Sequence, residues 1–268
     1  FAYLEHALSG DAFFARTRSL FTIHHLAYQG LFDRAVLGRV GLPDALFNMN
    51  DLEFYGRVNA LKAGILYATA VTTVSPRYSR EIQTPEFGCG LDGLLRHRAG
   101  ALHGILNGVD YRDWDPATDR LIPANFGPAD LAGKARCREE LVRMFGLDAP
   151  AGVPVVGMVT RLAGQKGLDI VCEALDRLLA LGLTLAILGT GDPKIQDFLA
   201  EARKKDPSRL GLKIAFDERI AHTIYAGSDA FLIPSRYEPC GLTQMYAMKY
   251  GTVPVVRATG GLDDSVQE

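Results

Sequence analysis

Several features that would place this chain in a special class are scarce or missing. The 268 residues include four cysteines and one tryptophan, and no two cysteines form a Cys-x-x-Cys pair. So few unpaired cysteines exclude a disulfide scaffold and the common zinc sites, and they favour a reducing compartment. No apolar run approaches the roughly 20 residues that a helix needs to cross a bilayer. We therefore expect a cytoplasmic protein with no membrane partner.

An excess of one charge is also missing. The chain has 29 Lys and Arg residues against 31 Asp and Glu residues, a net charge of -2, and the two halves are equally balanced. A polyanion partner would need a strongly basic face, so we expect no nucleic-acid partner. Any phosphate site must be local. The hydrophobic content of 48% is that of an ordinary globular protein, and the length predicts about two domains.

Short apolar runs alternate with helical patterns through the second half of the chain. They predict strands at 155–160, 183–188, 212–216, 230–233 and 253–256. Strands separated by single helices are typical of a parallel sheet. In the first half, further strands are predicted at 20–23, 70–74 and 105–106, and each ends at a polar turn. The sequence therefore predicts an α/β fold throughout.

A polar, proline-containing stretch without clear periodicity follows Asn107. We place the domain junction there, with one domain at 1–106 and a second at 107–268. The chain starts at Phe1 rather than at methionine, and it ends at Glu268 shortly after a glycine turn. We expect it to be an internal piece of a longer protein.

Two cations follow the first predicted strand of the second half. Ligands of open α/β sheets bind beyond the carboxyl ends of the strands, and Arg161 lies directly at such an end. Lys166 lies near the start of the next helix, where the helix dipole disfavours a cation. An anion between the two side chains would explain this placement, so the pair indicates a phosphate clamp. The alternative is a solvated surface pair.

A second candidate segment, Glu238-Pro239-Cys240-Gly241-Leu242-Thr243, follows the strand predicted at 230–233. Proline suits the first turn of a helix, and Gly241 would let a ligand approach the backbone. A helix starting here would aim the N–H groups of Cys240 to Thr243 at an anion. Glu238 just before it either caps this helix or reaches the ligand, and the spacing alone leaves both interpretations open.

Weaker signals occur at three other strand ends. Gly189 and Gly191 form a thin loop that would let a sugar or ribose approach, but the third glycine of the dinucleotide fingerprint is missing. Phe216 at a strand end is either a core residue or a platform for a base. His24 follows the first predicted strand. The histidines show no metal-ligand spacing, so we expect no metal site.

Five stretches resemble bacterial glycogen synthases and plant starch synthases, in the same order along the chain. They lie at 21–30, 106–110, 161–169, 188–193 and 234–244. The resemblance implies the GT-B architecture, in which two Rossmann-like domains with parallel sheets face each other across a cleft. It also implies transfer of glucose from ADP-glucose to the non-reducing end of an α-1,4-glucan, with retention of configuration and without a metal or other cofactor. A plant member of the family would lie in the plastid.

The resemblance assigns the chemistry to four residues. Arg161 and Lys166 match the residues that stabilise the departing ADP. Glu238 is similar to the family's acid beside the transferred glucose. His24 looks like the family's histidine near the donor glucose, where it would support the oxocarbenium-like state.

The resemblance also implies a set of substrate-binding residues. Phe216 matches an aromatic position at the adenine, and Asn107 matches a polar residue near the donor sugar. The loop around Gly189 and Gly191 would lie against the sugar or ribose. Phosphate oxygens and sugar hydroxyls would bind at Cys240, Gly241, Leu242 and Thr243.

The sequence departs from the family pattern in three places. The Lys-x-Gly-Gly motif that contacts the donor has no counterpart and would precede Phe1. The C-terminal helices that fold back after the second domain would follow Glu268, and His25 replaces the usual asparagine. Tyr246 stands where many related GT-B enzymes have a second acid, as it does in the synthase branch. We expect the piece alone to be inactive. One alternative is another retaining GT-B enzyme with a small acceptor; the other is a non-catalytic glucan-binding module, which the single Trp114 disfavours. The sequence leaves the oligomeric state open.

Overall fold

A computed structural model describes residues 1–267 and divides the chain into two compact units. The first unit is Phe1–Asn107, and the second begins at Gly108. The sequence predicts the junction one residue earlier, between residues 106 and 107. The last residue of the predicted second domain, Glu268, lies outside the described residues. None of the helices within residues 1–267 is long and apolar enough to span a bilayer.

The first unit is built on a three-stranded parallel sheet with the order β1-β5-β6. Its strands are β1 (Leu20–Ile23), β5 (Ala70–Thr73) and β6 (Leu102–Gly104). The helices packed on it include α3 (Ala60–Tyr67), α4 (Pro76–Glu81) and α5 (Asp92–His97). Side chains from both layers, such as Ile23, Ile65 and Leu95, form one buried core. The parallel sheet that the sequence predicts for this half is confirmed.

The third strand of this sheet lies three residues before its predicted position. Ile105 and Leu106 are exposed, and only the backbone N–H of Ile105 still donates to the sheet, to Thr73. The observed strand contains His103 and Gly104, which do not favour strands in isolation. Gly104 is needed because a Cβ there would lie 2.3 Å from the carbonyl oxygen of Ser75. Close backbone packing rather than apolar character therefore sets the end of this strand.

A small antiparallel sheet completes the first unit. It consists of β2 (Leu31–Phe32), β3 (Glu53–Phe54) and β4 (Arg57–Asn59), in the order β2-β4-β3. The short helix α1 (Ala2–His6) precedes β1 in the chain, and the short helix α2 (Val36–Arg39) follows β2. At the end of β4 the Asn59 side chain accepts a hydrogen bond from the N–H of Lys62 and so caps α3.

The second unit contains a five-stranded parallel sheet with the order β11-β10-β7-β8-β9. Its strands are β7 (Val155–Val159), β8 (Thr184–Leu188), β9 (Leu210–Lys213), β10 (Ala230–Ile233) and β11 (Val253–Val256). Its helices are α6 (Ala132–Phe145), α7 (Leu168–Ala180), α8 (Pro193–Lys205), α9 (Glu218–Gly227), α10 (Thr243–Lys249) and α11 (Gly260–Ser265). Single helices connect successive parallel strands, as the alternation in the sequence predicts.

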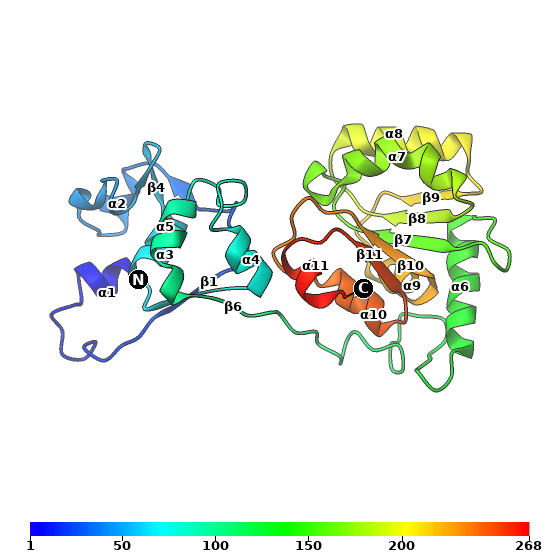
Figure 1. Ribbon diagram of the computed structural model, residues 1–268, viewed down its shortest axis with the longest axis horizontal. Helices are drawn as coiled ribbons and strands as arrows, with labels where there is room; N and C mark the ends of the chain where they lie inside the picture. Colours follow the sequence, from blue (N-terminus) through cyan, green and yellow to red (C-terminus); the bar gives the residue numbers. More distant parts are fainter. Residues whose placement is uncertain (268) are drawn as a thin grey trace. The chain divides into compact units, whose positions relative to one another are not determined.

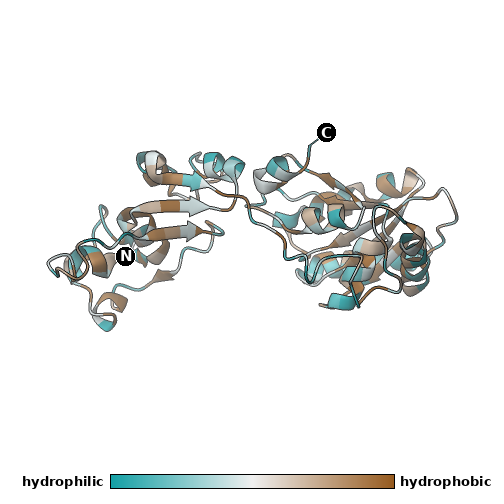
Figure 2. Ribbon diagram, turned by 90° about the horizontal axis from the view of Figure 1, so that it is seen from below, coloured by the Kyte–Doolittle hydropathy of each residue, from teal (hydrophilic) through white to brown (hydrophobic). Residues whose placement is uncertain are grey.

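The helices of the second unit cover both faces of its sheet (Figure 1). Helices α7 and α8 pack on one face over one apolar core, and α6 and α9 pack on the other face over a second core. The strands between them are mostly brown in Figure 2, and the helices carry more teal. Because both faces are buried, the central strands are continuous apolar runs, and this explains why the sequence identifies them so clearly.

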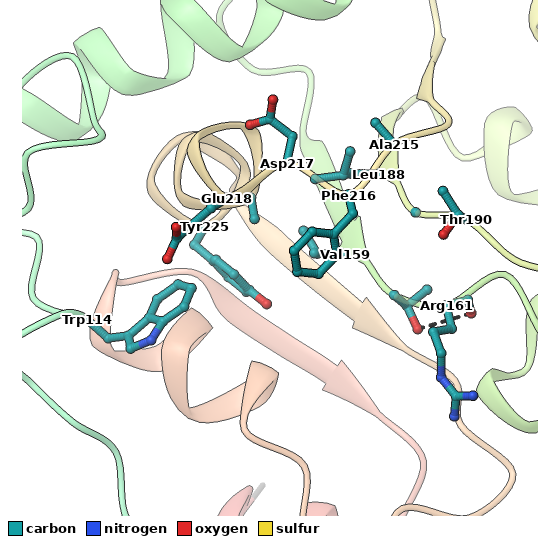
Figure 3. Close-up of a pocket in the computed structure, with 13 residues that line it drawn as sticks. Trp114, Val159, Arg161, Leu188, Thr190, Ala215, Phe216, Asp217, Glu218 and Tyr225 are labelled. Carbon is teal, nitrogen blue, oxygen red and sulfur yellow. Dashed lines mark hydrogen bonds between the residues drawn. The ribbon is translucent and has the colours of Figure 1, made fainter.

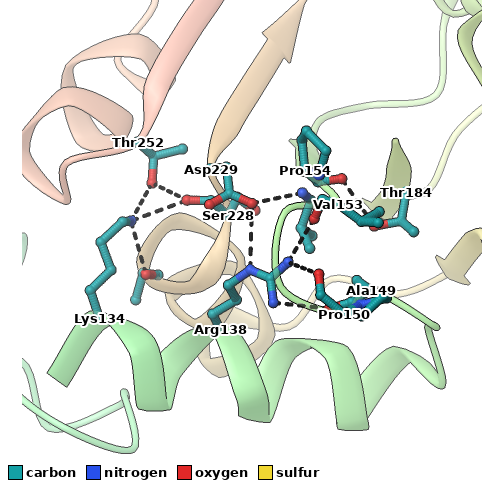
Figure 4. Close-up of polar contacts among 12 residues, drawn as sticks. Lys134, Arg138, Ala149, Pro150, Val153, Pro154, Thr184, Ser228, Asp229 and Thr252 are labelled. Atoms are coloured by element: carbon teal, nitrogen blue, oxygen red, sulfur yellow. Dashed lines mark hydrogen bonds and ion pairs between the residues drawn. The ribbon is translucent and has the colours of Figure 1, made fainter. Parts of the chain in front are cut away.

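Two basic residues of α6 form hydrogen bonds with the ends of several elements (Figure 4). The ammonium group of Lys134 donates to the carbonyl oxygens of Ala226, Ser228 and Tyr250 and to Oγ1 of Thr252, at 2.9–3.1 Å. Burial lowers the pKa of Lys134 to about 8. Four neutral acceptors thus hold one partly buried cation at the ends of α9 and α10.

Arg138, one turn further along α6, anchors the chain before the central strand of this sheet. Its guanidinium donates to the carbonyl oxygens of Ala149 at 3.0 Å and Val153 at 2.7 Å. It also lies 3.5 Å from the carboxylate of Asp229. That carboxylate accepts the N–H of Val155, the first residue of β7. These contacts fix the position at which β7 enters the sheet.

Candidate functional site

Two adjoining pockets open at the carboxyl ends of the parallel strands in the second unit. The first, which we call the polar pocket, is lined in part by Arg161, Lys166, Ser235, Glu238 and Thr243. The second, which we call the aromatic pocket, is lined by Arg161 together with residues that follow β8 and β9. Arg161 lines both, so the two pockets meet at this side chain.

The polar pocket contains an ion pair between Lys166 and Glu238. The ammonium nitrogen of Lys166 lies 2.5 Å from Oε2 of Glu238, and the two side chains are 20% and 11% exposed. The hydroxyl of Ser235 donates to the same carboxylate oxygen at 3.0 Å. Helix α10 starts only at Thr243, and its N-cap Leu242 makes no side-chain cap bond. The interpretation of Glu238 as a helix cap is therefore wrong.

Contacts between two loops bring Lys166 to a residue 72 positions away. Gly167 has a φ of +72°, and a Cβ at this position would lie 2.1 Å from the carbonyl oxygen of Pro234. Only glycine permits this approach. The N–H of Arg236 donates to the carbonyl oxygen of Gln165 at 2.9 Å, and the Gln165 side chain donates to the Tyr237 carbonyl. The loop after β7 is thereby fixed against the loop after β10.

Arg161 and Lys166 have different side-chain partners within the protein. Lys166 pairs with Glu238, whereas the exposed Arg161 donates to the side chain of Gln165 at 3.0 Å. The position of Lys166 near a helix start favours an anion beside it. In the structure this anion is the carboxylate of Glu238. Both cations still face the polar pocket, where a phosphate could replace Glu238 as the partner of Lys166.

The aromatic pocket has a volume of about 420 Å³ and a largely apolar lining. Phe216 stands in it with 98% of its surface exposed, because β9 ends at Lys213 and not at the predicted residue 216. The expectation that Phe216 ends a strand is wrong, and a core role is excluded. Figure 3 shows its ring between Trp114 at one end of the pocket and Arg161 at the other. A flat apolar ring so exposed is suited to stacking on a base.

The loop glycines are needed for a reason that the sequence analysis did not foresee. A Cβ at Gly189 would lie 1.9 Å from the carbonyl oxygen of Thr160, and one at Gly191 would lie 2.2 Å from that of Leu162. Both glycines therefore allow the chain after β8 to pack against the chain after β7. Gly189 also lines the aromatic pocket, whereas Gly191 forms a backbone bridge with Leu162.

The helix predicted to start within the run from Glu238 to Thr243 begins only at its last residue, Thr243. Cys240 is buried, and Gly241 has a φ of +70°, which interrupts any helix begun at Pro239. The Gln244 side chain donates to the carbonyl oxygens of Cys240 and Gly241, at 3.1 and 3.0 Å, and stabilises this turn. Of the predicted run, Thr243 lines the polar pocket and Leu242 is the N-cap of α10.

The other two predicted site residues lie in the first unit. His24 is exposed directly after β1, at the carboxyl end of that strand. Asn107 is half-buried and is the last residue of the first unit. Their roles remain predictions from the resemblance.

An aromatic stack that the sequence does not predict lies at the edge of the aromatic pocket. Trp114 is stacked on Tyr246 with ring centroids 3.8 Å apart, and on His222 at 4.0 Å. Trp114 lies in the polar stretch after Asn107, where the residues show no periodicity. A lone tryptophan in such a stretch was the only signal that could have indicated this role.

A buried hydrogen-bond network supports this stack. Oδ2 of Asp119 lies 2.7 Å from Nδ1 of His222 and accepts the hydroxyl of Tyr250 at 2.6 Å. Burial raises the pKa of Asp119, but the hydrogen bonds from His222, Tyr250 and the Leu121 N–H outweigh it and hold the pKa below its ordinary value. Residues 1–267 contain no cluster of three or more His, Cys, Asp or Glu side chains that could hold a metal ion.

Two family models match the chain in succession. The starch synthase catalytic domain matches residues 1–97, and the glycosyl transferases group 1 domain matches residues 143–268. A glycogen synthase from Anaeromyxobacter sp. (strain Fw109-5) is 54% identical over 98% of this chain and 55% of its own length. The chain belongs to the glycogen and starch synthase family.

Other members of the glycogen and starch synthase family match over the same extent. A glycogen synthase from Myxococcus xanthus is 54% identical over 94% of this chain and 53% of its own length. The catalytic domain of starch synthase IV from Arabidopsis thaliana, solved with ADP and acarbose, superposes with a TM-score of 0.89. It is 40% identical, with 97% of this chain and 55% of that chain covered. The chain spans about half the length of the curated relatives it matches.

The predicted fold class is confirmed as α/β of the GT-B type, with a parallel sheet in each unit. The family resemblance stated from the sequence motifs is confirmed as well.

Proposed function

We propose that the full-length protein transfers glucose from ADP-glucose to the non-reducing end of an α-1,4-glucan, with retention of configuration. The observation that carries the proposal is the joining of two pockets at Arg161, one polar and one aromatic. A nucleoside diphosphate sugar has the same division into a flat base, a diphosphate and a polar sugar.

The donor would extend across both pockets. The base would stack on Phe216 and the diphosphate would lie against Arg161 and Lys166, which leaves the glucose beside Glu238. Two cations at the leaving group can supply the charge stabilisation that a metal ion supplies in other enzymes. We therefore propose that the reaction needs no metal and no other cofactor.

The chemistry follows from the position of Glu238 beside the phosphate-binding lysine. The bond between the anomeric carbon and the phosphate oxygen breaks, and positive charge develops on the sugar. The carboxylate of Glu238 stabilises this charge. The acceptor hydroxyl then forms the new bond on the side from which ADP departs, and its proton passes to the departing phosphate. Retention follows without a covalent intermediate on Glu238, because the carboxylate lies on the phosphate side rather than opposite it.

The bacterial relatives support a cytoplasmic location for this activity. The substrates we propose are ADP-glucose and glycogen or a related α-glucan, and the starch synthase IV catalytic domain bound to ADP and acarbose supports both classes.

The test is a donor comparison with the full-length protein. We expect ADP release from ADP-glucose only when an α-glucan is present, much slower turnover of UDP-glucose, and no effect of a chelator. Equal use of the two donors, or transfer to a small acceptor in preference to glucan, would contradict the proposal and favour another enzyme of the same fold.

A further inference from the structure

Both hydrogen bonds that the structure gives to the Glu238 carboxylate fall on the same oxygen. Oε2 lies 2.5 Å from Nζ of Lys166 and 3.0 Å from Oγ of Ser235. Within residues 1–267, Oε1 carries no hydrogen bond, and Glu238 lines the polar pocket. Oε1 is therefore the oxygen that is open to a ligand in this pocket.

The two partners of Oε2 differ in how freely they can leave. Lys166 has a flexible stem and faces the position proposed for the diphosphate, so a bound donor competes with Glu238 for its ammonium group. Ser235 is fully buried at the end of β10, and its hydroxyl donates to no other described group. Its backbone position is fixed because the preceding residue, Pro234, packs against Gly167. Once Lys166 turns to the phosphate, Ser235 is the group that still holds the carboxylate.

We infer that Ser235 is a positioning residue for the reaction proposed above. Its hydroxyl fixes Oε2 of Glu238, so that Oε1 faces the anomeric carbon while Lys166 binds the departing diphosphate. The inference rests on the proposed function. It assigns Ser235 no contact with the substrate, and its whole effect on the rate passes through Glu238.

Because Ser235 acts on a charge that matters most in the transition state, its loss lowers kcat rather than affinity. We expect Ser235→Ala to reduce kcat roughly 10- to 100-fold, the range for loss of one hydrogen bond to a charged group. The KM for ADP-glucose should stay within about twofold of wild type. Ser235→Cys has nearly the same size but a weak donor, and it should lose a similar share of the rate.

The decisive experiment is a double-mutant cycle in the full-length protein, with ADP release in the presence of glycogen as the assay. Ser235→Ala is measured in the wild-type and Glu238→Gln backgrounds. If Ser235 acts through the carboxylate, its effect on kcat disappears once that carboxylate is gone. The matched control is Ser228→Ala, because Ser228 is equally buried in the same unit and its hydroxyl has no hydrogen-bond partner in the described chain. Ser228→Ala should leave kcat unchanged in both the wild-type and the Glu238→Gln background.

An equal loss of kcat in both backgrounds would show a structural role and overturn the inference. A wild-type kcat in both Ser235→Ala and Ser235→Cys would overturn it too, as would a rise in KM at constant kcat. If Ser235→Ala does not fold, Ser235→Cys takes its place in the cycle. Failure of the proposed function is seen separately, because wild-type protein would then release no ADP from ADP-glucose in the presence of glycogen.

Discussion

Two lysines of the second unit are partly buried, and the surroundings of their ammonium groups differ. Lys134 is surrounded by neutral oxygens, three of them backbone carbonyls at the ends of α9 and α10. Lys166 has one carboxylate as its partner, in a pocket that opens to solvent. The first arrangement uses all donors of the ammonium group and leaves no room for a ligand. The second holds a cation and an anion that a charged substrate can separate.

These surroundings distinguish a structural cation from a functional one. A cation with neutral partners on several elements stabilises their packing, because it supplies hydrogen bonds to backbone carbonyls at their ends. A charge paired across a pocket can exchange its partner without disturbing the fold. This division between structural and functional lysines predicts a different result for the substitution of each kind.

The largest effect is expected for Lys166→Ala. We expect kcat/KM for ADP-glucose to fall by roughly 10² to 10³, comparable to loss of one preorganised group that stabilises charge in the transition state. The free energy of unfolding should fall by less than about 2 kcal/mol, because Ser235 and water in the open pocket still solvate Glu238. Steady-state kinetics and thermal unfolding of the same preparation measure both. A loss of stability large enough to explain the loss of activity would show that Lys166 has a structural role, as Lys134 has.

The opposite pattern is expected for Lys134→Met. The substitution removes the Lys134 donor from the carbonyl oxygens of Ala226 and Tyr250, whereas that of Ser228 can still accept from the Thr252 hydroxyl, and it should cost about 2–4 kcal/mol of unfolding free energy. The protein that remains folded should keep a kcat/KM within about threefold of wild type. Denaturant unfolding and kinetics at low temperature test this. Full stability in Lys134→Met would show that the network in Figure 4 contributes little.

The charge state of Lys134 gives a smaller, pH-dependent effect. Burial lowers its pKa from 10.5 to about 8, so between these values the unfolded chain binds more protons than the folded one. Stability contributed at this site therefore rises with pH from about 8 to 10.5, by at most about 1.4 kcal/mol per pH unit. The measurement is the difference in unfolding free energy between wild type and Lys134→Met across this range. A difference that does not change with pH would contradict the lowered pKa.

The smallest effect is expected for an exposed lysine, which is neither held by backbone carbonyls nor paired in a pocket. Lys204 pairs with Glu201 on the surface of α8, where the two side chains are 71% and 66% exposed. Lys204→Ala should change the unfolding free energy by less than about 0.5 kcal/mol and leave kcat unchanged. Thermal unfolding beside Lys134→Met gives the comparison. If Lys204→Ala lost as much unfolding free energy as Lys134→Met, burial of the ammonium group could not explain the effect of Lys134→Met.

The central parallel strands of the second unit could be predicted from the sequence because both faces of the sheet are buried. Their apolar runs end at the strand tips, and Arg161, Lys166 and Glu238 follow those tips directly. The topology alone was enough to bring these three residues to one edge. The partner of Lys166 could not be predicted, because a contact over 72 residues depends on the packing of Gly167 against Pro234.

Local backbone geometry explains the errors. Pro239 favours a first helical turn, whereas the positive φ of Gly241 delays the start of α10 to Thr243. The apolar residues before Phe216 predict a strand that includes it, but β9 pairs with β8 only as far as Lys213. The stack on Trp114 could not be predicted at all, because its partners come from α9 and α10, more than 100 residues further along the chain.

The most direct test of the division between the two lysines is ADP binding, measured by calorimetry in the full-length protein. We expect Lys166→Ala to weaken the Kd for ADP at least tenfold and Lys134→Met to leave it within about twofold of wild type, when both are measured well below their unfolding temperatures. Equal weakening in the two variants, or an unchanged Kd in Lys166→Ala, would contradict the assignment of Lys166 to the donor phosphate.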